Sequence, residues 1–231
     1  MSNPTIAQRL AAVHERIAAA AIAARRKPAS VRLVAVSKTV DAAAVGEALA
    51  AGQLAFAENR VQELTAKAAL LPAECEWHLI GHLQHNKARA AVRTATWIHS
   101  VDSIELLERL DRIAAEEERR PKVLLQVNLT GEKSKSGFTP MEVLAATAVV
   151  RACTHLDCQG FMTMAGLDAD EAALRACFSG LRKLRDGVAP RYGLPLRELS
   201  MGMSGDYEVA IAEGATMVRI GTAVFGPRQA L

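Results

Sequence analysis

The feature of this sequence that most constrains its fold is a regular alternation of short apolar segments with helical ones. The segment from Val31 to Val36 is rich in β-branched residues, which is typical of a buried strand, and a helical stretch follows it. The same order repeats along the chain. Strands are predicted near 31–38, 54–59, 76–81, 96–100, 122–129, 157–163, 197–202 and 216–221. Helices are predicted at 42–51, 60–71, 86–94, 103–119, 140–153, 169–187 and 206–213.

The spacing of the predicted strands favours a closed barrel. Their ends lie 19 to 39 residues apart, which leaves room each time for one crossover helix and a return strand. Eight such units make an α/β protein with a single (β/α)8 barrel of the TIM type. A doubly wound open sheet is the alternative, but no GxGxxG motif follows the first strand. No linker interrupts the series, so we expect one domain over residues 1–231, with an amphipathic N-terminal helix within 1–28 packing on the barrel.

Composition and charge argue against several classes of protein. The chain has 28 basic and 25 acidic residues, and a formal charge of +3 indicates neither a nucleic-acid nor a membrane partner. The apolar runs are too short to span a bilayer, and the amino terminus lacks the pattern of a secretory signal. The four cysteines include no CxxC pair and are interpreted as reduced core thiols. We expect a cytoplasmic protein, and we expect it to be a monomer.

A lysine at the end of the first predicted strand is the first candidate for chemistry. In (β/α)8 barrels the reactive groups gather at the carboxyl ends of the strands. Side chains alternate along a strand, so Val34, Val36 and Lys38 share one face. If that face is the barrel interior, Lys38 projects into the mouth from an apolar wall, where burial lowers the pKa of an amine and makes it nucleophilic. The competing interpretation is a lysine just beyond the strand that reaches into solvent.

The last two predicted strands carry the features of a phosphate site. Arg219 lies in the middle of the apolar run from Thr216 to Thr222, and a buried arginine needs an anion or a hydrogen-bond acceptor. Gly221 and Thr222 follow it, and the run from Ser200 to Asp206 forms a second small-residue loop that leads into a helix. Barrel enzymes frequently hold a phosphate between the loops after strands seven and eight. Ordinary glycine turns are the alternative.

Together, these residues suit pyridoxal 5′-phosphate as the cofactor. Lys38 would form the internal aldimine, and Arg219 would face the pyridine nitrogen and keep it unprotonated. The phosphate would be held by Ser204, Gly221 and Thr222. Three further residues are candidates for the cofactor-binding mouth, with a purely structural role as the alternative for each: Asn59, His78 and Met203. We predict no metal site, because the cluster of His78, His82 and His85 has neither an HExxH nor a CxxC pattern.

Several motifs also resemble one known family, the pyridoxal-phosphate homeostasis proteins, over residues 5 to 228. The most specific are Leu199–Asp206 (LSMGMSGD) and Val218–Gly226 (VRIGTAVFG); the others are Val34–Thr39, Glu58–Glu63, Trp77–Lys87, Ile98–Ser103, Gln126–Asn128 and Gly160–Met164. The resemblance implies a barrel related to the N-terminal domain of alanine racemase, which is fold type III of the pyridoxal-phosphate proteins, without the second β-domain. It also implies a cofactor on Lys38 and a role in vitamin B6 and amino-acid homeostasis without established turnover. Apo pyridoxal-phosphate enzymes and free amino acids are the partners that it suggests.

Two other functions remain open from the sequence. A racemase of low activity needs a second base, which an alanine racemase takes from its β-domain. The chain stops at Leu231 and we expect no such domain here, so Tyr207 or His78 would have to replace it, whereas Tyr192 is expected on the wrong side of the barrel. A barrel enzyme acting on a phosphorylated metabolite without a cofactor is the third function. The polar loop that contains Lys133 and Lys135 is either solvated or a lid over the mouth.

Overall fold

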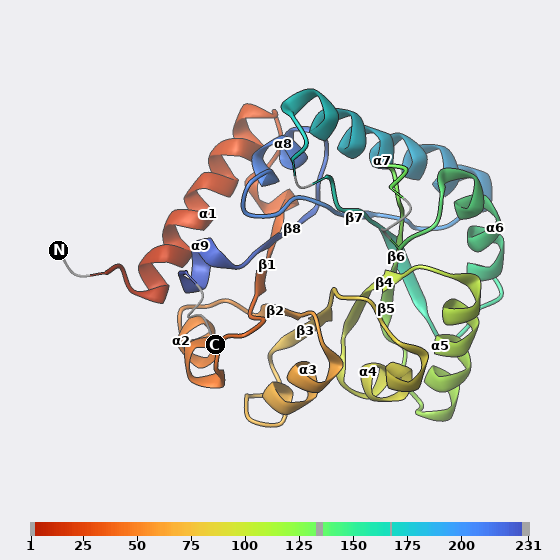
Figure 1. Cartoon of the computed structure of the whole chain (residues 1–231), viewed down its shortest axis with the longest axis horizontal. Helices are drawn as coiled ribbons and strands as arrows, with labels where there is room; N and C mark the ends of the chain where they lie inside the picture. Colours follow the sequence, from red (N-terminus) through yellow and green to blue (C-terminus); the bar gives the residue numbers. More distant parts are fainter. Residues whose placement is uncertain (1–2, 133–135, 167, 228–231) are drawn as a thin grey trace.

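The computed structural model describes residues 3–132, 136–166 and 168–227, and shows a closed barrel of eight parallel strands in chain order (Figure 1). Lys133 and Lys135 lie outside the described residues. The strands are β1 (Arg32–Val36), β2 (Ala55–Glu58), β3 (Glu76–Leu79), β4 (Trp97–Val101), β5 (Lys122–Gln126), β6 (Asp157–Met162), β7 (Glu198–Ser200) and β8 (Met217–Ile220). Pairing of β1 with β8 closes the sheet, with Val34 opposite Arg219. The (β/α)8 barrel predicted from the strand spacing is therefore confirmed.

Helices surround the barrel on the outside (Figure 1). They are α1 (Ile6–Ala23), α2 (Ala42–Ala50), α3 (Val61–Ala68), α4 (Ala88–Thr94), α5 (Ile104–Glu116), α6 (Pro140–Val150), α7 (Glu171–Tyr192), α8 (Tyr207–Ala212) and α9 (Thr222–Phe225), with short 3-10 turns η1 (Pro28–Ser30) and η2 (His85–Lys87). The helix α1 begins with a capping box in which Thr5 and Gln8 bond each other's backbone N–H groups. It packs against α2, α8 and α9, so it completes the ring where α9 is only four residues long.

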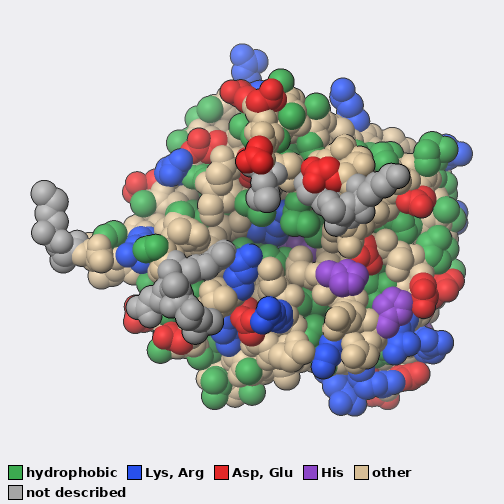
Figure 2. Space-filling view, viewed as in Figure 1, with side chains coloured by type: hydrophobic (Ala, Val, Ile, Leu, Met, Phe, Trp, Pro, Cys, Tyr) green, Lys and Arg blue, Asp and Glu red, His purple; other side chains and the backbone are tan. Residues whose placement is uncertain are grey.

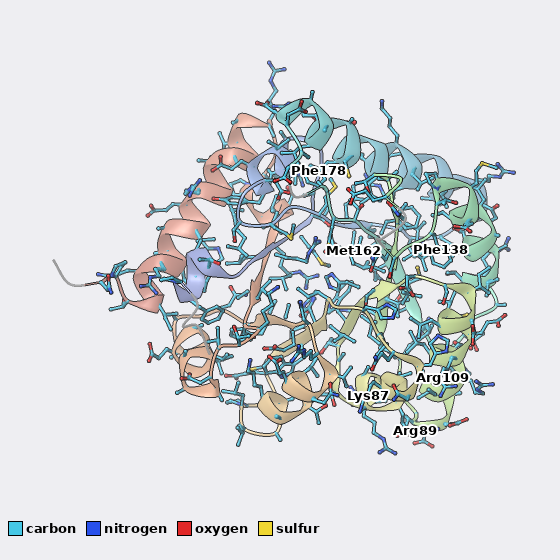
Figure 3. All side chains as sticks on the ribbon, in the orientation of Figure 1. Lys87, Arg89, Arg109, Phe138, Met162 and Phe178 are labelled. Carbon is cyan, nitrogen blue, oxygen red and sulfur yellow. The ribbon has the colours of Figure 1, made fainter. Side chains whose placement is uncertain are left out.

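Alternation along the strands divides the apolar side chains into two layers. A small cluster fills the barrel interior and includes Val34, Val36, Ala57, Trp97, Leu124 and Met162. A much larger cluster lies between the strands and the helices. Figure 3 labels one residue of each cluster: Met162 on β6 belongs to the interior cluster, and Phe178 on the overlying α7 belongs to the outer one. The inward face of β1 is therefore the one with Val34 and Val36, as Lys38 at the mouth requires.

Several element boundaries differ from the predicted ones, among them those at β5, at α7 and after β8. The loop predicted after Ile220 contains the short helix α9. The fifth strand ends at Gln126, and only an isolated bridge joins Val127 to Phe138. The helix α7 continues through Pro190 to Tyr192 and ends at Gly193, which has a left-handed backbone with φ of 62°. Pro190 lies in the last turn and removes one hydrogen bond of the helix, the one to the carbonyl of Asp186. No helix within the described ranges is both long and apolar enough to cross a membrane.

Candidate functional site

A cavity of 410 Å³ opens at the carboxyl ends of the strands, where the loops of seven different strands meet. Figure 2 shows this face of the molecule, with basic side chains visible at and beside the central hollow. The lining combines one lysine, one arginine, hydroxyl and amide groups, and an apolar wall. Its residues are Val36, Lys38, Asn59, Ile80, Gly81, His82, Gln126, Ser136, Met164, Met203, Ser204, Arg219, Gly221 and Thr222. Seven of the eight predicted cofactor-binding residues are thus brought together here, and His78 is the exception.

Lys38 reaches this cavity because of where β1 ends. It is half-buried and continues the inward face of Val34 and Val36. The next residue, Thr39, has φ of 64°, in the left-handed region that a β-branched residue rarely adopts. Its N–H donates to Glu63 Oε2 at 3.2 Å, and its hydroxyl donates to the carbonyl of Lys38 at 2.6 Å. These bonds hold a strained turn directly after the lysine, which is a feature of functional sites.

Behind Lys38 lies a buried ion pair that the sequence analysis did not identify. Lys67 on α3 donates to Glu58 Oε1 at 2.6 Å and to the carbonyl of Ser37 at 2.7 Å. The hydroxyl of Ser37 donates to the same carboxylate oxygen at 2.6 Å. Burial raises the pKa of Glu58, against the opposing hydrogen bonds from Lys67 and Ser37. The network fastens the peptide group between Ser37 and Lys38 to β2 and α3.

Arg219 is the buried cation of the site. Its exposure is 4%, and its Nη1 and Nη2 donate to Ser200 Oγ at 2.7 Å and to the carbonyl of Thr163 at 3.0 Å. Both acceptors are neutral. Burial lowers the pKa of Arg219 to about 10, with the charge of Asp206 acting in the opposite direction. An arginine has five N–H donors, so the guanidinium retains donor capacity toward the cavity that it lines.

The loops after β7 and β8 place backbone at the cavity wall. Gly202 has φ of 92°, and an added Cβ would lie 2.6 Å from the Cβ of Ala210, so the turn accepts only glycine. The carboxylate of Asp206 accepts from the N–H of Met203 at 2.5 Å and fixes the loop that presents Ser204. After β8, Thr222 begins α9, and the first N–H groups of a helix have no acceptor within it. These loops are therefore suited to an anion.

His78 lies deeper in the barrel than the cavity lining. It is fully buried, its Nδ1 is 2.8 Å from Nε2 of His99, and its Nε2 is 3.1 Å from Glu76 Oε1. Its ring also stacks on Trp97 at a centroid distance of 5.6 Å. Alternation along β3 places His78 inward, as predicted, but too far below the strand end to line the mouth. The sequence analysis did not anticipate His99 as its partner, because a contact between two strands leaves no local pattern.

The two tyrosines considered as a second base do not line the cavity. Tyr207 is 3% exposed, and its ring faces Arg16 on α1, with the guanidinium carbon 5.5 Å from the ring centroid. The expectation that it stands beside the cofactor is thus wrong for its side chain, although it follows the loop of Ser204. Tyr192 closes α7 and lies beside Arg191, at 5.8 Å.

Several lining residues were missed from the sequence. His82 is exposed, lines the cavity, and its Nδ1 is 3.0 Å from Asp102 Oδ2. Gln126, the last residue of β5, donates to the carbonyl of Ser136 at 2.8 Å. Gln126 is a polar residue at a strand end, which is the signal in the sequence that indicates a place at the mouth. The three histidines proposed as a cluster have separate partners, and the part of the chain described here holds no group of three potential metal ligands.

The comparisons with known proteins agree with this geometry. The profile of the alanine racemase N-terminal domain matches residues 9–229. The pyridoxal phosphate homeostasis protein of Pseudomonas aeruginosa is 46% identical, over 97% of this chain and 96% of its own length. The chain belongs to the pyridoxal phosphate homeostasis protein family.

Solved structures show how far the likeness extends. PipY of Synechococcus elongatus PCC7942, solved with pyridoxal phosphate bound, is 45% identical, with a TM-score of 0.87 over 96% of this chain and 100% of PipY. Alanine racemase from Corynebacterium glutamicum has a TM-score of 0.71 at 17% identity, and the match covers 62% of that enzyme. The racemase therefore shares the barrel fold with this family member, whereas PipY is similar to it in sequence over nearly the whole length of both chains.

Proposed function

We propose that this family member binds pyridoxal 5′-phosphate in the 410 Å³ cavity and serves in its homeostasis. The observation that carries the proposal is that Lys38, the buried guanidinium of Arg219, whose two hydrogen-bond acceptors are neutral, and two glycine loops line a single pocket. The volume lies within the range of about 300–1,000 Å³ usual for small-molecule sites. The name of its relatives and the cofactor bound to PipY support the same ligand.

The donor set of the cavity fits each part of this cofactor. The amine of Lys38 would attack the aldehyde carbon to form a carbon–nitrogen double bond, and the aldehyde oxygen would leave as water. Ser204, Gly221 and Thr222 would hold the phosphate with hydroxyl and backbone N–H groups, as helix starts hold anions. Arg219 would donate to the pyridine nitrogen, which therefore stays unprotonated because an arginine is itself a permanent donor. Asn59 and Met203 would contact the ring.

We propose that the chain holds and releases the cofactor, for apo enzymes or free amino acids, rather than turning substrates over. A racemase needs a second positioned acid–base group opposite the lysine, and such groups contribute about 10²–10⁴-fold to a rate. Neither Tyr207 nor His78 lines the cavity. His82 lines it but is exposed, so water competes for its proton. Exchange of the α-hydrogen of amino acids for solvent deuterium should therefore be slow, and fast exchange would establish the racemase alternative.

The assignment of Lys38 is tested by absorption spectroscopy. Wild-type protein mixed with pyridoxal phosphate should develop the visible band of a Schiff base, and reduction with borohydride should fix the cofactor on the peptide that contains Lys38. The variant Lys38→Ala should lack the band, whereas Lys183→Ala, at an exposed position of α7, should retain it. An unchanged band in Lys38→Ala would refute the assignment. A colourless wild-type protein without cofactor-dependent stabilisation would favour the enzyme of a phosphorylated metabolite.

A further inference from the structure

A continuous row of hydrogen-bonded side chains crosses the barrel interior below the cavity. Arg219 Nη1 lies 2.7 Å from Ser200 Oγ, and this oxygen lies 2.9 Å from Nδ1 of His99. Nε2 of His99 lies 2.8 Å from Nδ1 of His78, and Nε2 of His78 lies 3.1 Å from Oε1 of Glu76. The row begins at the first residue of β3 and ends at the cavity lining, so it joins the two ends of the barrel.

The donors and acceptors in this row allow a single direction when both rings are neutral. The carboxylate of Glu76 only accepts, so Nε2 of His78 carries the hydrogen and its Nδ1 accepts. Nε2 of His99 must then donate to His78, and its Nδ1 accepts from the hydroxyl of Ser200. That hydroxyl hydrogen is thereby turned away from Arg219, and the Ser200 oxygen presents a lone pair to the guanidinium. The charge of Glu76 thus orients a group at the opposite end of the barrel.

The surroundings of the two rings keep them neutral. Burial lowers the pKa of His78, against the hydrogen bond with Glu76, and the charges of Arg32 and Lys122 lower it further. Burial lowers the pKa of His99 well below its usual value, and the charge of Arg219 acts in the same direction.

Charged side chains also lie at both ends of this row of hydrogen-bonded residues. Glu76 is bonded by Arg32 at 2.8 Å. Its pKa is raised by burial but lowered more strongly by the bond with His78 and by the charge of Arg32. Asp206 acts on Arg219 from the loop after β7, and Trp97 covers His78 from β4. His78, His99 and Ser200 are fully buried, and this low-dielectric packing strengthens the bonds between them.

We infer that Ser200, His99, His78 and Glu76 form a one-directional relay of positioning residues that orients Arg219 toward its ligand. The relay holds Nη1 of Arg219 on the Ser200 oxygen, and the carbonyl of Thr163, which lies outside the relay, accepts from Nη2. With these two groups held, the remaining donors of the guanidinium are directed to the cavity. The inference rests on the proposed function only in naming pyridoxal phosphate as the ligand, because the hydrogen bonds of the relay are present in the protein without it. Its residues need not touch the cofactor.

The first test uses the protein without cofactor. Nitrogen NMR of the labelled imidazoles should show His78 and His99 as neutral Nε2–H tautomers between pH 5 and pH 9, with exposed His14 as the reference ring. In Ser200→Ala, Nδ1 of His99 loses its donor, so its nitrogen signal should move to that of a ring nitrogen without a hydrogen bond, while Nε2 keeps its hydrogen because Nδ1 of His78 still accepts it. In Ser100→Ala the signal of Nδ1 should not move, although Ser100 is also buried on β4 and its hydroxyl has no partner within the described residues. A charged ring or an Nδ1–H form in the wild type would overturn the relay.

The second test measures the consequence for binding. Ser200→Ala should raise the dissociation constant of pyridoxal phosphate about tenfold or more, as expected when a bond to a charged group is lost, and Ser100→Ala should leave it unchanged. Glu76→Gln keeps an accepting oxygen and should preserve the tautomers, whereas Glu76→Ala should not. Equal affinities of Ser200→Ala and wild type would overturn the positioning role. If the wild type binds no pyridoxal phosphate but shows the expected tautomers, the proposed function fails and the relay stands. If Ser200→Ala does not fold, the relay is tested by the tautomers of the wild type and of the two Glu76 variants.

Discussion

Replacing Lys67 by methionine removes one partner of the buried ion pair behind Lys38. The ammonium makes two short hydrogen bonds, at 2.6 and 2.7 Å, and the carboxylate of Glu58 is fully buried. Breaking a buried pair from one side costs about 3–5 kcal/mol of unfolding free energy, because a charge is left without compensation. For a chain of this length, that loss corresponds to a fall in Tm of roughly 6–20 °C.

Urea unfolding of Lys67→Met measures this loss, with Lys183→Met at an exposed position of α7 as the matched control. The double variant Lys67→Met/Glu58→Gln should recover part of the loss, because the uncompensated carboxylate is removed. A free energy of unfolding within about 0.5 kcal/mol of wild type, the usual range for surface substitutions, would refute the reasoning. The cofactor band should also weaken in Lys67→Met, since the carbonyl of Ser37, next to Lys38, loses its donor.

The same variant has a defined pH dependence. Burial already raises the pKa of Glu58 in the wild type, and removal of Lys67 raises it further. The folded chain then binds a proton that the unfolded chain releases above a pKa of about 4.3. The contribution of Glu58 to the stability of Lys67→Met is therefore fully present below that pH and is lost as the pH rises through the raised pKa of the folded state. The difference from wild type should be smaller at pH 5 than at pH 8, and the opposite order would contradict the assignment.

Three further outcomes are expected. Gly202→Ala should lower the free energy of unfolding by about 1–3 kcal/mol and weaken cofactor binding. The reason is that φ of Gly202 is 92° and that an added Cβ would lie 2.6 Å from the Cβ of Ala210 on α8. Equal stability of variant and wild type in urea unfolding would contradict this. Leu124→Ala should cost about 2–5 kcal/mol of unfolding free energy, since Leu124 is fully buried in the barrel interior, whereas exposed Met141→Ala should cost almost nothing. Burial raises the pKa of Cys158 to about 12 and that of Cys153 to about 11, so both thiols should react slowly with an alkylating reagent at pH 8 and rapidly in denaturant; fast labelling of the folded chain would refute it.

The barrel could be predicted because its signal is local and repeated. Each strand is a short run of β-branched and apolar residues, and each gap has the length of one crossover, so the topology follows from the rule that such crossovers are right-handed and sequentially adjacent. The first and last residues of the helices and strands were harder to predict from the sequence. The helix α9 is one turn long, and four residues carry no periodicity that could separate a helix from a glycine loop. The continuation of α7 past Pro190 depends on contacts that only the folded chain makes.

The site could be predicted where a residue's role follows from its own position on a strand. Lys38 was placed by alternation along β1 and Arg219 by its position within an apolar run, and the structure brings both to one cavity. The ion pair of Glu58 and Lys67 could not be placed in this way, since it depends on the face of α3 that meets β2. Tyr207 shows the same limit. Its position after the loop of Ser204 suggested the cavity, but the first turn of α8 directs its ring toward α1.

The apolar residues that stabilise the fold and the buried cation of the site lie in different layers of the barrel, so the fold and the site can be predicted from different residues. The layer between strands and helices is mostly apolar, apart from the ion pair of Glu58 and Lys67, and contributes most of the burial that stabilises the barrel. The barrel interior is narrower and contains the buried polar row that ends at Arg219. Placing a guanidinium there costs desolvation that its two neutral acceptors offset only in part. An acceptor that enters the cavity completes the set, so ligand binding and folding are linked at this one residue. The apolar burial of the outer layer offsets that cost in the absence of ligand, so a site with a buried cation can exist in a stable barrel.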